Sequence, residues 1–213
     1  MQRPRTPYEA WKAMESGNAR FVQGVVEHPD QDAARRTELA LDQRPFALLF
    51  GCGDSRVAAE IIFDRGLGDL FVVRTAGHVI DTSVLGSIEL GIVELGIPLV
   101  VVLGHDHCGA VGITIKAMDS GIMPPGYIRD LVQRVSPSVM AARAAGTASL
   151  DEIEAEHVRQ TAHLLVERSS IVAEAVREGR LAVVGTVYDL RDGRVRPVDV
   201  VGDISPGDPP APA

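Results

Sequence analysis

The chain is poor in cysteine, carries an excess of negative charge and lacks a long apolar segment. Its 213 residues include two cysteines, too few for the disulfide frameworks of secreted proteins. The formal net charge of −8 would repel a polyanion over most of the surface, so nucleic acid is a poor partner. The most apolar stretch, Ile97 to Leu103, is too short to span a bilayer, and the first residues lead into no apolar signal core. We therefore expect a soluble cytoplasmic protein that does not enter a membrane.

The apolar content and the length predict one globular domain. Apolar residues make up 46 % of the chain, enough for a full core, and no linker or internal repeat divides it. We predict a single domain over residues 1–204, with an N-terminal helical arm over residues 1–42. Residues 205–213 are rich in Pro, Ala and Gly and are predicted to form a disordered tail.

The arm carries a clear helix start. Thr6 suits the N-cap, Pro7 suits the first helical position, and Glu9 stands where a capping box has its acid. The apolar stripe that follows includes Trp11 and Phe21, which must be buried somewhere. A second subunit is one place that could cover them.

From residue 46 onward, short apolar runs alternate with helical patterns. The runs are apolar throughout, which is typical of strands buried on both faces, and the strand–helix alternation predicts a parallel sheet in an α/β domain. We predict strands over residues 46–50, 70–73, 98–103 and 181–190. We predict helices over residues 32–42, 57–64, 82–95, 110–118, 127–143 and 151–178. Asp192-Gly193 predicts a hairpin turn into a strand over residues 195–201, which Pro197 confines to an edge.

Both cysteines lie in loops at the C-terminal end of a predicted strand. Cys52 lies in the first such loop, and His105 and Cys108 lie in the second. Because ligands bind outside the carboxyl ends of parallel strands, two neighbouring loops would bring these side chains together. Thiolate and imidazole are ligands that zinc prefers, and three protein ligands leave a fourth position open, as in catalytic zinc sites.

Other interpretations of these loops stay open. The cysteines could be buried apolar fillers, or Cys and His could form a nucleophilic pair. Gly51-x-Gly53 between a strand and a helix matches part of a dinucleotide-binding fingerprint, but Arg56 replaces its third glycine. His107 competes as a ligand, although its side chain should diverge from that of the adjacent Cys108.

Asp54 and Arg56 stand two residues apart on the first loop, where they can pair. A carboxylate held by a guanidinium does not become a zinc ligand and stays available to accept a hydrogen bond from the nucleophile. Asp106 is expected to be hydrogen-bonded scaffolding. We expect His28, His78, His157 and His163 to face solvent or to lie near the site without binding metal.

These residues resemble the β-class carbonic anhydrases, especially bacterial ones. The resemblance rests on two paired strings, Cys52-Gly53-Asp54-Ser55-Arg56 and Gly104-His105-x-x-Cys108-Gly109. Phe71-Val72-Val73-Arg74 and Gly185-x-x-Tyr188-Asp189 add to it, and the run from Ala76 to Asp81 is similar to actinobacterial members. The likeness covers nearly the whole chain, to about Val201.

The resemblance implies an α/β fold with a four-stranded parallel core sheet, an added edge strand, flanking helices and an N-terminal arm that embraces a partner in a homodimer or homotetramer. It implies zinc held by Cys52, His105 and Cys108. A zinc-bound hydroxide would then hydrate carbon dioxide reversibly to bicarbonate and a proton. Asp54 and Arg56 form the implied catalytic dyad, and Asp54 is expected to become a fourth ligand in a closed state as the pH falls.

The resemblance also implies a substrate pocket. Gln43 matches a glutamine that bonds substrate across the dimer interface, Phe71 and Ala76 match apolar wall positions, and Gly109 belongs to the same pocket. Two positions depart from the family pattern. Leu90 replaces a tyrosine that some members carry, and Leu49 replaces the tryptophan of members with a regulatory bicarbonate site, which puts that regulation in doubt.

Three rival functions remain at this point. The same scaffold could act on a carbon dioxide analogue such as carbon disulfide. A non-catalytic module that binds bicarbonate or zinc would have less need of the Asp54–Arg56 pair. A thiol-dependent hydrolase would keep its activity when metal is chelated and lose it when its thiol is alkylated.

Overall fold

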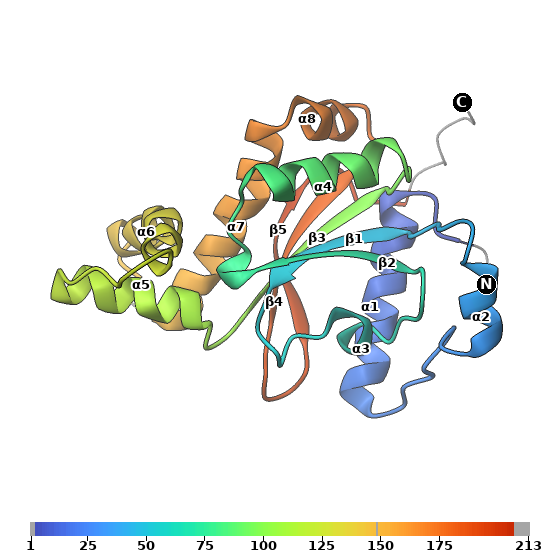
Figure 1. Cartoon of the computed structure of the whole chain (residues 1–213), viewed down its shortest axis with the longest axis horizontal. Coiled ribbons are helices and arrows are strands. Elements are labelled where there is room, and N and C mark those ends of the chain that lie inside the picture. The colour runs from blue at the N-terminus through green and yellow to red at the C-terminus, as the bar shows by residue number, and fades with distance from the viewer. Residues whose placement is uncertain (1–2, 148, 207–213) are drawn as a thin grey trace.

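The computed structural model describes residues 3–147 and 149–206. A five-stranded sheet lies between two helical layers, and a pair of helices projects beyond one end of it (Figure 1). The strand order is β2-β1-β3-β4-β5; the first four strands are parallel and β5 is antiparallel to β4. This confirms the predicted parallel sheet with an edge strand. The strands are β1 (Ala47–Cys52), β2 (Leu70–Thr75), β3 (Leu99–His105), β4 (Ala182–Tyr188) and β5 (Val195–Val201).

The helices fall close to their predicted positions. They are α1 (Pro7–Gln23), α2 (Ala33–Glu38), α3 (Ala59–Ile62), α4 (Thr82–Val93), α5 (Gly109–Ser120), α6 (Ile128–Ala144), α7 (Leu150–Arg168) and α8 (Ser170–Arg177). No helix in the described part of the chain is long and apolar enough to cross a membrane. The tail predicted for residues 205–213 lies almost entirely outside the described residues.

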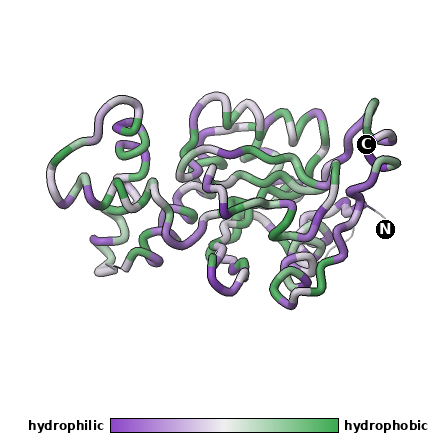
Figure 2. The backbone as a smooth tube through the Cα atoms, turned by 60° about the horizontal axis from the view of Figure 1, so that its bottom comes forward, coloured by the Kyte–Doolittle hydropathy of each residue, from purple (hydrophilic) through white to green (hydrophobic). Residues whose placement is uncertain are grey.

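Two cores sandwich the sheet, because successive side chains of a strand point to opposite faces. On one face, Leu48 and Phe50 pack with α4, α7 and α8. On the other face, Ala47 and Leu49 pack with α1 and α3. In Figure 2 hydrophobic residues follow the central strands, as expected for strands that are buried on both sides.

The N-terminal helix packs on its own chain. Thr6 and Glu9 form the predicted capping box. Trp11 is only 5 % exposed and belongs to the core under the sheet, while Phe21 packs against the same core from its edge. Asn18 donates to the carbonyl of Gly193 and so ties α1 to the β4–β5 turn. No second subunit is needed to bury the tryptophan.

The helix predicted over residues 151–178 is in fact two helices. Ser169 has extended backbone angles and separates α7 from α8. Its side chain accepts from the backbone amide of Val172, which caps α8, and its hydroxyl donates to Glu89 at 2.6 Å. A serine that offers its own hydrogen bonds to the backbone favours such a break. The prediction of one continuous helix was therefore wrong at this residue.

Candidate metal centre

Three potential metal ligands meet at the carboxyl edge of the sheet. Cys52 ends β1, His105 ends β3, and Cys108 directly precedes α5. Strands β1 and β3 are parallel neighbours, so their carboxyl ends lie side by side. The two sulfur atoms and an imidazole nitrogen all lie within 4.8 Å of one another, and all three residues are buried. The sequence prediction that these loops meet at this edge agrees with the structure.

The imidazole of His105 is oriented for ligation. Its Nδ1 lies 2.8 Å from the carbonyl oxygen of Asp106, and because a carbonyl only accepts, Nδ1 carries the proton. The lone pair is therefore on Nε2. That atom is buried and has no hydrogen-bond partner among the described residues. A buried unpaired nitrogen is costly in a folded protein, and a metal ion between it and the two sulfurs would satisfy it. The residues present thus fit a zinc ion.

The two thiols shift each other's acidity. The hydrogen bond from Cys108 holds the pKa of Cys52 far below its usual value, with help from His105 and from the amide of Gly77, 3.3 Å from the sulfur. The same contact raises the pKa of Cys108. One proton leaves easily and the second only with difficulty, because two thiolates this close repel each other. A cation between them removes that repulsion.

Asp54 and Arg56 form the predicted pair beside the cluster. Arg56 donates from Nε to Oδ1 at 2.9 Å and from Nη2 to Oδ2 at 2.7 Å. The guanidinium keeps the pKa of Asp54 well below its usual range. Oδ1 also accepts from the Arg56 amide, whereas Oδ2 keeps one lone pair free and lies 4.0 Å from Nε2 of His105. The carboxylate therefore presents one open acceptor position to the cluster.

Both loops are anchored from behind. Arg74 donates from Nε to the carbonyl of Cys52 and from Nη2 to the carbonyl of Asp54. Asp106 accepts from the amide of Leu190 at 2.8 Å, which ties the second loop to the end of β4 and bears out its role as scaffolding. The guanidinium of Arg74 is thus engaged in hydrogen bonds to the backbone of its own chain.

The residues expected to form the substrate pocket are not gathered in one place within a single chain. Ala76 and Gly109 lie at the site edge, because Ala76 follows β2 and Gly109 follows Cys108. Phe71 pairs with Leu48, four residues before the end of β2, so it lies roughly 13 Å along the strand from that edge. Gln43 is exposed in the segment before β1.

The other histidines divide into exposed and buried ones. His107 has a positive φ of 53°, and its side chain is exposed, whereas that of Cys108 is buried. His28 and His163 are exposed. His78 and His157 are buried and stack on each other, with ring centroids 4.4 Å apart. Burial lowers the pKa of both.

One buried residue near the site was not recognised in the sequence. Glu154, on α7, is 2 % exposed and accepts from the amide of Cys108 at 2.7 Å. Desolvation raises the pKa of its carboxyl to about 7. A signal for it exists, because Glu154 shares a helix face with the buried residues Val158, Thr161 and Leu165. A charged residue at a core position of an amphipathic helix is unusual.

The comparison with known families decides the identity of the chain. The family model described as carbonic anhydrase matches residues 47–195. The chain belongs to the carbonic anhydrase family. It is 56 % identical in sequence to a carbonic anhydrase of Mycolicibacterium smegmatis, over 93 % of this chain and 96 % of that protein. Carbonic anhydrase 2 of Mycobacterium tuberculosis is 54 % identical over the same shares.

Solved structures place the chain in the β class of carbonic anhydrases. The β-carbonic anhydrase CafA of Aspergillus fumigatus superposes with a TM-score of 0.69 and 26 % identity, over 89 % of this chain and 90 % of that one. The two departures from the family pattern are visible in the fold. Leu90 is exposed on α4, and Leu49 is buried within the core under the sheet.

Proposed function

We propose that this protein hydrates carbon dioxide reversibly to bicarbonate and a proton, with zinc held by Cys52, His105 and Cys108. The observation that carries the proposal is the buried, unpaired Nε2 of His105, which lies 4.0 Å from an arginine-held carboxylate. It belongs to a cluster in which an imidazole nitrogen and both sulfurs lie within 4.8 Å of one another. When bound, zinc would supply an acidified water as the nucleophile. Family membership supplies the reaction class.

In this proposal Asp54 and Arg56 act as a pair. The free lone pair of Asp54 Oδ2 accepts the hydrogen of the attacking nucleophile and so aims its electron pair at the carbon atom of the substrate. Arg56 holds both carboxylate oxygens, which keeps Asp54 from binding the metal itself. If that grip weakened, Asp54 would be free to act as a fourth ligand of the metal and would close the site.

The substrate pocket would be shared between two copies of the chain. Gln43 would bond a substrate oxygen of the neighbouring site, while Phe71, Ala76 and Gly109 would line the apolar space. Two features support a second copy. Strand β2 is an edge of the sheet, and exposed apolar side chains lie on the segments next to it: Leu67 just precedes β2, and Leu90 is on α4, which contacts β2. We propose a homodimer or homotetramer. Two structurally similar β-carbonic anhydrases, from Sordaria macrospora, are described as tetrameric.

A cytoplasmic location is part of the proposal. Cys52 and Cys108 are free thiols that lie within 4.8 Å of each other, and the site requires both to remain reduced. A reducing compartment keeps them so.

Zinc content and carbon dioxide hydration test the function together. The purified protein is expected to hold one zinc ion per chain, and stopped-flow hydration should fall when a chelator removes the metal and recover when zinc returns. Hydration that persists without metal would refute the proposed site. A thiol-dependent hydrolase would instead keep its activity after chelation and lose it on alkylation.

A further inference from the structure

A buried polar stripe runs along one face of α7. Glu154, His157 and Thr161 follow one another at intervals of three and four residues, so they project from the same face of the helix. Their exposed fractions are 2 %, 4 % and 2 %, respectively. Buried ionisable side chains are costly unless they serve a specific contact. Glu154 contacts the loop that carries Cys108, and His157 contacts a neighbouring loop that donates to the sulfur of Cys52.

Glu154 holds the loop of Cys108. Its Oε1 accepts from the amide of Cys108 at 2.7 Å, while its Oε2 is buried without a hydrogen-bond partner among the described residues. Cys108 is also the N-cap residue of α5, and its side chain makes no capping hydrogen bond to the helix. The carboxyl group therefore fixes the backbone at the point where the thiol leaves it.

His157 holds the loop that contacts Cys52. Its Nε2 lies 2.8 Å from the carbonyl oxygen of Gly77, and the amide of Gly77 donates to the sulfur of Cys52 at 3.3 Å. Gly77 has a φ of +64°, and a Cβ atom there would lie 2.6 Å from the Cβ of Ala110, so only glycine fits at this position. One residue of α7 thus holds the loop of Cys108, and another holds the Gly77 loop that contacts Cys52.

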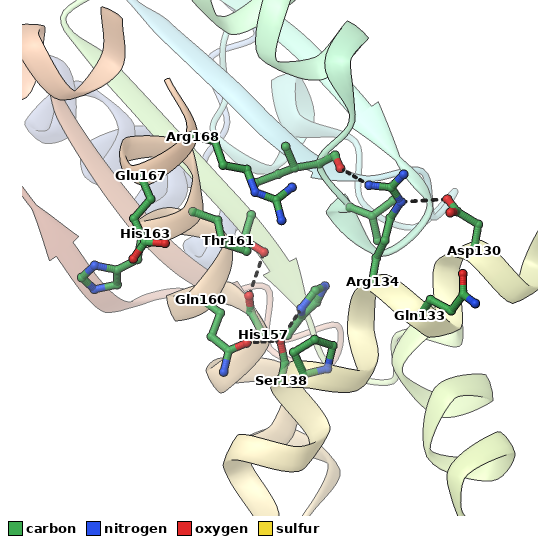
Figure 3. Close-up of a pocket in the computed structure, with 14 residues that line it drawn as sticks. Asp130, Gln133, Arg134, Ser138, His157, Gln160, Thr161, His163, Glu167 and Arg168 are labelled. Carbon is green, nitrogen blue, oxygen red and sulfur yellow. Dashed lines mark hydrogen bonds and ion pairs between the residues drawn. The ribbon is translucent and has the colours of Figure 1, made fainter. Parts of the chain in front are cut away.

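The ring of His157 is itself fixed. Ser138 Oγ lies 2.9 Å from Nδ1, and the ring stacks on His78. Figure 3 shows Ser138 and His157 pointing toward each other in the wall of a cavity of about 570 Å³ between α6 and α7. Because the carbonyl of Gly77 only accepts, the proton on the ring is on Nε2 and Nδ1 faces the hydroxyl.

We propose that Glu154 and His157 are positioning residues of the metal centre, each of which sets the geometry of one cysteine ligand through the backbone. This inference rests on the proposed function, because it assumes that the cysteines bind zinc. Groups that orient metal ligands typically change metal affinity about 10- to 100-fold when they are removed. Neither residue would touch the substrate.

Four variants test the proposal in the full-length protein. Glu154→Gln and His157→Gln keep an amide that can bond the same backbone group, whereas Glu154→Leu and His157→Phe keep the volume and lose the bond. We expect Glu154→Leu and His157→Phe to weaken zinc binding about 10- to 100-fold in chelator competition, and Glu154→Gln and His157→Gln to stay within a few-fold of the parent. The thiolate-to-cobalt absorption of the Co²⁺-substituted protein should shift in Glu154→Leu and His157→Phe and be retained in Glu154→Gln and His157→Gln.

Exposed residues of the same helix supply matched controls. Glu167→Leu and His163→Phe make the same changes on α7 outside the polar stripe and should leave zinc affinity and the cobalt spectrum unchanged. Thermal unfolding of each variant separates loss of folding from loss of ligand geometry. If Glu154→Leu or His157→Phe does not fold, the substitution to Gln at the same position tests the proposal, since that variant would have to retain the cobalt spectrum of the parent.

The outcomes separate the two proposals. Zinc affinities and cobalt spectra that match the parent in Glu154→Leu and His157→Phe would overturn the positioning role, while carbon dioxide hydration by the zinc-loaded parent would still uphold the proposed function. If Glu154→Gln and His157→Gln bind zinc as weakly as Glu154→Leu and His157→Phe, the positioning role is also overturned, because the backbone bond would then not be the cause. A parent protein that binds no zinc would overturn both.

Discussion

Trp11 provides a sharp test of where the N-terminal arm belongs. Its side chain is 5 % exposed and packs under the sheet of its own chain. Burying a tryptophan removes roughly 200 Å² from water, which at about 25 cal/mol per Å² amounts to about 5 kcal/mol. Truncation of a buried tryptophan to alanine typically costs about 3–5 kcal/mol. In a chain of this size each kcal/mol lowers the melting temperature by about 2–4 °C.

We therefore expect Trp11→Ala to lower the melting temperature by roughly 6–20 °C. Because the tryptophan is buried within one chain, the deficit should be the same at every protein concentration, and analytical ultracentrifugation should find an unchanged oligomeric state. Trp11→Phe should recover most of the loss. Tyr127→Ala is the matched control, because this aromatic side chain is 94 % exposed and should hardly matter.

Two results would refute this reasoning. A melting temperature within about 2 °C of the parent would mean that the side chain is not buried in the folded chain. A deficit that grows on dilution, together with a smaller oligomer, would mean that the tryptophan is covered by a partner and not by its own sheet.

Three further predictions concern the site and its surroundings. Arg56→Ala should release Asp54 toward the metal and reduce the stopped-flow hydration rate by about 100-fold. Arg180→Ala is the control, because it breaks a similar pair with Glu178, two residues away, and should leave the rate unchanged. An Arg56→Ala enzyme with normal rates would contradict the role of the pair. Cys52→Ser should lose zinc, and full retention in metal analysis would exclude Cys52 as a ligand. Burial lowers the pKa of His78, so the unfolded chain binds a proton at this imidazole more tightly than the folded chain. The free energy of unfolding should therefore fall by up to about 1.4 kcal/mol per pH unit as the pH drops below about 6.5. Urea titrations of His78→Asn should show a flatter dependence on pH, and a slope equal to that of the parent would assign the effect to other groups.

Local sequence patterns were sufficient for most of the fold. The apolar runs at residues 46–50 and 98–103 have no polar alternation, and this property identifies strands covered on both faces. Capping chemistry fixed the start of α1 at Thr6. The error at Ser169 arose because the helical periodicity continues across it. At the break Ser169 caps α8 and also donates to Glu89, 80 residues away, which no periodicity reveals.

The sequence by itself predicted that Cys52, His105 and Cys108 would gather, because they stand at or just after strand ends and neighbouring strand ends in a parallel sheet must meet. It also determined the Asp54–Arg56 pair, since two residues of spacing bring their side chains together within one loop. Only the tertiary structure decided what holds these loops. Glu154 and His157 reach Cys108 and Gly77 from a helix 46 and 80 residues away in the chain, and no local pattern carries such a contact. Tertiary packing likewise decided that Trp11 is covered by its own sheet, because a stripe of apolar residues specifies that a surface is buried but not which surface buries it.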